Sequence, residues 1–283
     1  MSRIRVLQAT GTRKPLYIFP GIGGTLDTFV DLARRFSGER PVYGVKAVGE
    51  QNECEPLREM HQLAATHAAD IRMVQRHGPY YLFGYSFGGS LAFEVARELM
   101  SHGERVGLVA LADAPAPGYP KLPPAWRRAQ AHVNTFYRLD KAGRLAYLKE
   151  RVDRRVKRVR HMLGIREPVQ EVVAAEENPV SQRVVNALAE AYKHYVPTPL
   201  SVDVLFLQAE TQPDWPATKF DDPLAGWGPV LRGRIVQCQT PGSHLKIFDA
   251  QHVEVLVQHL KLGIAQAERA ENFPPSVPPP AFS

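Results

Sequence analysis

Residues 80–90 read YYLFGYSFGGS, an apolar run that leads into a Gly-x-Ser-x-Gly pattern. The run is typical of a buried strand, and the residues after it have helical periodicity. A serine on a sharp turn from strand to helix has a strained backbone, so the residues two before and two after it must be small. Gly84 and Gly88 stand there. The pattern predicts Ser86 as a nucleophile, and the structural alternative is a Gly-rich turn that only packs helix on strand.

Short apolar runs alternate with helical periodicity on both sides of this stretch. The predicted strands cover residues 16–19, 41–45, 80–85, 106–112, 202–208 and 234–239, and the predicted helices cover 26–36, 57–75, 90–100 and 246–267. Such alternation predicts a mostly parallel sheet flanked by helices on both faces. We therefore expect residues 1–114 and 200–271 to form one α/β core.

Residues 115–199 show helical patterns only, over 126–137, 144–163 and 181–195. A helical excursion between two strands of one sheet predicts a lid over the carboxyl ends of the strands, where open α/β sheets bind their ligands. A helical decoration without a gating role is the alternative. The proline-rich tail, residues 272–283, is predicted to be disordered.

The composition is that of a globular protein. The 283 residues are 44% hydrophobic and 23% charged, and Cys54 and Cys238 are the two cysteines. Two cysteines make a disulfide framework or a cysteine-rich metal site implausible and suit a reducing cytosol. No signal-peptide pattern and no apolar run of about 18 residues occurs, and P-loop, zinc-ligand and EF-hand motifs are missing. We expect a cytoplasmic protein with no metal and no bound cofactor.

A serine nucleophile needs a base and an acid that orients the base. Among ten histidines, His244 follows the last predicted strand, which places it on a loop at the same sheet edge as Ser86. A solvated or packed imidazole is the alternative for His244. Asp113 ends the next strand, 27 residues after Ser86, so it should emerge beside the serine and hold the imidazole tautomer. Glu210 and Asp214, after a later strand, compete for the acid role.

The loop after the first predicted strand has two interpretations. Residues 20–24 read PGIGG, which begins a Gly-x-Gly-x-x-Gly dinucleotide fingerprint, but its third position is Leu26. In a serine hydrolase the same loop supplies a backbone N–H to an oxyanion hole. Gly21 or Ile22 would then be one donor, and the N–H of Phe87 the other.

The order serine, aspartate, histidine along the chain is that of an α/β-hydrolase. The chain resembles the type I-like thioesterase domains of polyketide synthases, fatty-acid synthases and nonribosomal peptide synthetases. The resembling parts are residues 6–8, 14–21, 84–89, 113 and 241–244. That family typically places its acid after the strand that follows the elbow helix, as Asp113 does here. Residues 19–20 read Phe-Pro where many relatives have His-Pro or Pro-Pro, which leaves Gly21 and Ile22 both open as donors.

The resemblance implies a substrate and a partner. The substrate would be an acyl or peptidyl chain, held as a thioester on the phosphopantetheine arm of an acyl or peptidyl carrier protein. Ser86 would form an acyl-enzyme, and water or an internal nucleophile of the chain would release the product by hydrolysis or cyclisation. The alternatives are an editing, type II-like thioesterase that clears misloaded carriers, a carboxylester hydrolase, and a fold retained only for binding.

The positive charge is concentrated in the predicted lid. The formal net charge is +6, and residues 115–200 carry +8 against +1 for residues 1–114 and −3 for residues 201–283. A solvated helix face is one interpretation. The other is that Arg154, Arg155 and Arg158 meet an acidic carrier protein and steer its arm toward Ser86. We expect neither a nucleic-acid nor a membrane partner.

Overall fold

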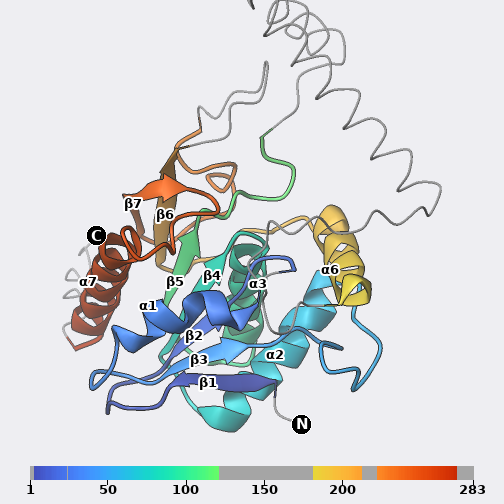
Figure 1. Ribbon diagram of the computed structural model, residues 1–283, viewed down its shortest axis with the longest axis horizontal. Coiled ribbons are helices and arrows are strands. Elements are labelled where there is room, and N and C mark those ends of the chain that lie inside the picture. The colour runs from blue at the N-terminus through green and yellow to red at the C-terminus, as the bar shows by residue number, and fades with distance from the viewer. Residues whose placement is uncertain (1–2, 24, 121–180, 212–221, 273–283) are drawn as a thin grey trace, which may run out of the picture. The chain divides into compact units, whose positions relative to one another are not determined.

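A computed structural model describes residues 3–23, 25–120, 181–211 and 222–272. The sheet in this part of the chain has seven strands in the order β1-β3-β2-β4-β5-β6-β7 (Figure 1). The strands are β1 (Ile4–Gln8), β2 (Leu16–Phe19), β3 (Val42–Val45), β4 (Tyr80–Tyr85), β5 (Val106–Ala112), β6 (Val204–Thr211) and β7 (Ile235–Ser243). All neighbours pair in parallel except β1 and β3, which are antiparallel. The predicted fold class, a mostly parallel sheet flanked by helices, is confirmed.

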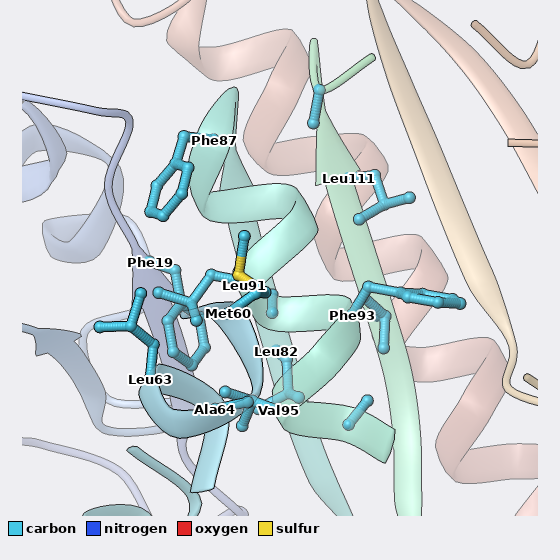
Figure 2. Packing of buried hydrophobic residues seen from close by; sticks show 14 of the residues in the cluster. Phe19, Met60, Leu63, Ala64, Leu82, Phe87, Leu91, Phe93, Val95 and Leu111 are labelled. Atoms are coloured by element: carbon cyan, nitrogen blue, oxygen red, sulfur yellow. The ribbon is translucent and has the colours of Figure 1, made fainter. Parts of the chain in front are cut away.

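Helices cover both faces of the sheet. The described helices are the 3-10 helix η1 (Leu26–Phe29) and α1 (Val30–Arg34), α2 (Met60–Val74), α3 (Phe87–Ser101), α6 (Gln182–His194) and α7 (Val253–Asn272). One apolar cluster joins α2, α3 and α6 to the sheet, and a second joins η1, α1 and α7 to its other face. Figure 2 shows the first cluster around Leu82 of β4 and Leu91 of α3. Because both faces of the sheet are covered, β2 is buried at every position. This explains why its sequence is an unbroken apolar run.

Two elements differ most from the sequence predictions. β1 was not predicted as a strand, and it pairs with β3 at the edge of the sheet with Val6 exposed. The last helix begins at Val253 rather than residue 246, because residues 244–252 form successive turns. In these turns Lys246 N donates to Ser243 O at 2.8 Å, and His252 N donates to Asp249 O at 2.8 Å.

The predicted lid falls mostly outside the described residues, as do its first two helices. Its third helix is α6, whose buried residues Val184, Ala187, Leu188 and Ala191 face the core. Val184, Leu188 and Ala191 belong to the same apolar cluster as α2 and α3. A lid role for residues 115–199 stays a prediction. The residues of the predicted tail after Asn272 are also outside the described part. None of the described helices has the length and apolar character that a bilayer span requires.

Candidate active site

Ser86 lies at the turn between β4 and α3 in a strained conformation. Its φ of 54° and ψ of −123° are unfavourable for a residue with a side chain. Neighbouring backbone groups hold this geometry, since Ser86 N donates to Ala112 O at 3.0 Å and Gly89 N donates to Ser86 O at 3.0 Å. The Ser86 side chain is thereby fixed at the carboxyl edge of the sheet, at the first turn of a helix.

The glycines around Ser86 are required by close packing. A Cβ on Gly84 would overlap the carbonyl oxygen of Gly88, and a Cβ on Gly88 would overlap that of Phe19. Gly89 is as constrained, because a Cβ there would overlap the side chain of Ala114. The sequence argument for small residues at positions 84 and 88 therefore has a direct structural cause.

Asp113 and His244 form a hydrogen-bonded pair at the same edge of the sheet. Asp113 Oδ2 lies 2.6 Å from His244 Nδ1, and the two side chains are 11% and 34% exposed. Asp113 Oδ1 also accepts the N–H of Ala209 at 3.1 Å, and Asp113 N donates to Leu207 O at 2.7 Å. Because an ionised carboxylate can only accept, the proton of a neutral His244 ring sits on Nδ1 and leaves Nε2 as an acceptor.

Tyr85 contacts His244 through its ring and its hydroxyl group. The sequence did not predict this contact. The two rings stack with centroids 4.8 Å apart and planes 27° apart, and the Tyr85 hydroxyl donates to the His244 carbonyl oxygen at 2.6 Å. Phe248 packs edge-on against Tyr85 at 4.9 Å. The pKa of Tyr85 is raised mainly by burial and to a smaller extent by the nearby Asp113 carboxylate. The Tyr85 hydroxyl therefore stays protonated and remains a donor. Tyr85 is the residue between the first glycine and the serine of the Gly-x-Ser-x-Gly pattern, which leaves that position unspecified. The aromatic residue at this position was the one sequence signal for the contact.

The loop after β2 lies against the turn at Ser86 between β4 and α3, which we call the elbow. A Cβ on Gly21 would lie 3.5 Å from Ser86 Cβ and 3.2 Å from the Tyr85 ring. Phe87 is the first residue of α3, whose opening backbone N–H groups have no partner within the helix. Ile22 is exposed. The structure thus brings Gly21 to Ser86, and an oxyanion role for Gly21, Ile22 or Phe87 stays a prediction.

The remaining predicted residues are placed as follows. Glu210 lies within β6 and is exposed, and Asp214 is outside the described residues. Asp113 is therefore the acid that pairs with His244. In the described part of the chain, no hydrogen bond joins Ser86 Oγ to the His244 ring; in enzymes without substrate such contacts are often long and tighten in the complex. Arg154, Arg155 and Arg158 are outside the described residues.

No group of three or more potential metal ligands from His, Cys, Asp and Glu occurs within the described ranges. Cys54 is exposed and Cys238 is partly buried, and both are free thiols. Burial raises the pKa of the Cys238 thiol, which makes it a poorer nucleophile than an ordinary cysteine.

Tyr85→Phe is expected to lower kcat about three- to tenfold, with little change in KM, for a reaction that uses His244 as its base. The change removes one hydrogen bond to the His244 backbone but keeps the ring stack, so the imidazole is held less firmly. The matched control is Tyr80→Phe, which removes a buried hydroxyl that donates to Gln75 O at 2.8 Å. Steady-state kinetics and thermal unfolding of both variants distinguish a loss of His244 positioning from a general loss of protein stability. Equal kcat losses in the two variants would contradict a positioning role.

Comparisons with known proteins extend this picture. The family model described as "Thioesterase domain" matches residues 14–262. The chain is 28% identical over 260 residues to atromentin synthetase invA1 of Paxillus involutus, which covers 87% of this chain and 26% of the relative. It therefore spans about a quarter of that synthetase.

Two solved structures share the fold. The type II thioesterase BorB from the borrelidin biosynthetic cluster has a TM-score of 0.62 at 21% identity, covering 92% of this chain and 98% of that one. The NocB thioesterase domain, in covalent complex with a fluorophosphonate nocardicin G analog, has a TM-score of 0.61 at 19% identity, covering 92% and 99%. Since the family model extends over strands β2 to β7, Ser86, Asp113 and His244, the chain belongs to the thioesterase domain family.

Proposed function

We propose that this thioesterase releases an acyl or peptidyl chain from the phosphopantetheine arm of a carrier protein, by hydrolysis or cyclisation, through an acyl-enzyme on Ser86. The observation that carries the proposal is the Asp113–His244 hydrogen bond of 2.6 Å at the sheet edge where strained Ser86 precedes α3. A serine needs a positioned acid and base to become a nucleophile.

In the first half-reaction His244 Nε2 takes the proton of the Ser86 hydroxyl as Oγ attacks the thioester carbonyl. The oxyanion accepts hydrogen bonds from the N–H of Phe87 and from that of Gly21 or Ile22. The attack gives a tetrahedral intermediate. Its collapse breaks the C–S bond, and the His244 imidazolium gives its proton to the leaving thiolate. Asp113 stabilises the imidazolium while it exists and keeps its proton on Nδ1.

In the second half-reaction the nucleophile is water, or a hydroxyl or amine of the acyl chain itself. His244 removes its proton as it attacks the Ser86 ester, and the same imidazole then protonates Ser86 Oγ as the C–O bond breaks. Hydrolysis and cyclisation thus use the same residues and differ in whether water reaches the ester. The basic residues Arg154, Arg155 and Arg158 are our proposal for the contact with an acidic carrier protein.

Intact-mass spectrometry after rapid quenching tests the proposal. We expect a mass gain equal to the acyl group on incubation with a carrier-bound thioester, and a smaller yield with the same acyl group on free pantetheine. Peptide mapping should place the adduct on Ser86. The matched oxoester is the control for a carboxylester hydrolase: faster loading from the oxoester than from either thioester would contradict thioesterase function.

A further inference from the structure

A pocket opens directly beside Ser86. Its volume is about 370 Å³, counted with its open mouth, and its lining includes Gly21 and Phe87 from the two sides of the elbow. Gly21 lies close to Ser86 in space, and Phe87 follows Ser86 in the chain. A group bound in this pocket would therefore lie next to the acyl carbon that Ser86 attacks.

Most of the pocket wall is apolar. Leu91 from α3 and Leu188 from α6 line it together with Val45 and Ala47. Figure 2 shows Phe87 and Leu91 projecting from α3 to the side of Phe19, away from Phe93. Such walls suit a short aliphatic group, and they make any polar side chain among them conspicuous.

His67 of α2 is one polar side chain in the wall. It is 1% exposed, and its Nδ1 has no hydrogen-bond partner among the described residues. Asp70 Oδ2 lies 3.9 Å away, beyond hydrogen-bond distance, and both Asp70 oxygens accept from Arg3 at 2.7 and 2.9 Å. Burial lowers the pKa of His67 despite the opposing effect of Asp70, so the ring is neutral near pH 7. A buried neutral imidazole with an unmet nitrogen is a hydrogen-bonding group in need of a partner.

Glu50 is the other polar side chain of the lining. It lies on the loop after β3, where its Oε2 accepts the N–H of Ala47 at 3.0 Å. Within the described residues Glu50 forms no ion pair. A carboxylate on an apolar pocket with no protein cation beside it favours a ligand that carries positive charge.

We propose that this pocket receives the acyl group of the substrate and selects a short aminoacyl group. Its ammonium pairs with the Glu50 carboxylate, and the His67 imidazole hydrogen-bonds the bound group. Leu91 and Leu188 cover its aliphatic part. The inference rests on the proposed function, since it assigns the substrate class of the same serine. Glu50 and His67 act as specificity-determining residues, and neither takes part in the proton transfers at Ser86.

The test uses two nearly isosteric N-acetylcysteamine thioesters, alanyl and 2-methylpropanoyl, which differ by an ammonium in place of a methyl group. Because the ammonium also activates the carbonyl chemically, the comparison is made between variants. Glu50→Gln should lower kcat/KM for the alanyl thioester about ten- to a hundredfold, the size of a hydrogen bond to a charged group. It should leave the 2-methylpropanoyl thioester within about twofold of the wild type.

The matched control is Glu53→Gln. Glu53 lies in the same loop and accepts the N–H groups of Gly49 at 2.9 Å and Gln51 at 3.0 Å, but it is not part of the pocket lining. We expect this variant to leave the ratio of the two thioesters unchanged. His67→Phe, where it folds, should shift the ratio in the same direction as Glu50→Gln.

Two different results would contradict the pocket assignment and the proposed thioesterase function. Equal losses for both thioesters in Glu50→Gln, or an unchanged ratio, would overturn the pocket assignment while the wild-type enzyme still hydrolyses thioesters. Failure of the wild type to be acylated by these thioesters and by a carrier-bound thioester would instead overturn the proposed function.

Discussion

Ser86→Ala is expected to lower kcat for thioester turnover by a factor on the order of 10⁴ or more, because it removes the nucleophile and leaves only binding and oxyanion stabilisation. The expected loss is larger than for the Tyr85 and Asp113 substitutions. Steady-state hydrolysis of a pantetheine thioester and labelling by a fluorophosphonate probe measure it, and the variant should lose both.

The matched control is Ser90→Ala. Ser90 is one turn further along α3 and fully buried, so its removal tests the effect of losing a hydroxyl from the same helix. It should keep labelling and turnover near the wild-type level. A Ser86→Ala enzyme with more than a tenth of wild-type turnover would exclude the acyl-enzyme mechanism.

Asp113→Asn should lower kcat by about 10³- to 10⁴-fold with little loss of thermal stability. An asparagine amide can donate to Nδ1, so the imidazole would adopt the tautomer with its proton on Nε2, where it cannot accept from Ser86. Oδ1 can still accept from Ala209 N, which preserves the local fold. Hydrolysis rates and thermal unfolding curves together check both parts of this prediction.

Glu210→Gln is the control, since Glu210 is the described member of the alternative acid pair. It lies exposed in β6, and its substitution should leave kcat within about twofold. A large loss in Glu210→Gln with activity retained in Asp113→Asn would reverse the assignment of the acid.

The strands buried on both faces could be predicted closely from sequence. β2, β4 and β5 have the predicted bounds, because a parallel strand in the middle of a sheet is an unbroken apolar run. β1 is short, carries Arg5 and ends in Gln8, and it pairs at the edge through its backbone, so its sequence has no comparable hydrophobic signal. The start of α7 was misplaced because residues 246–252 have helix-compatible side chains but fold into turns after β7.

The candidate site could be predicted where its residues follow strands. Ser86, Asp113 and His244 each come directly after a strand end, and parallel strands bring such positions to one edge. The contact of Tyr85 with His244 spans 159 positions of the chain and has no sequence pattern. The same holds for Glu50 and His67, whose shared pocket arises from the packing of a loop against α2.

The anchoring of Asp113 has a consequence for folding. Its carboxylate and its backbone N–H are held by Ala209 and Leu207 of β6, a strand encoded far from β5 and on the other side of the predicted lid. A one-residue slip of β6 would turn its side chains to the opposite faces and withdraw both anchors. In the proposed mechanism, turnover therefore depends on completion of the sheet: a chain that has folded its first half correctly still has a serine, but no oriented base until β6 docks in register.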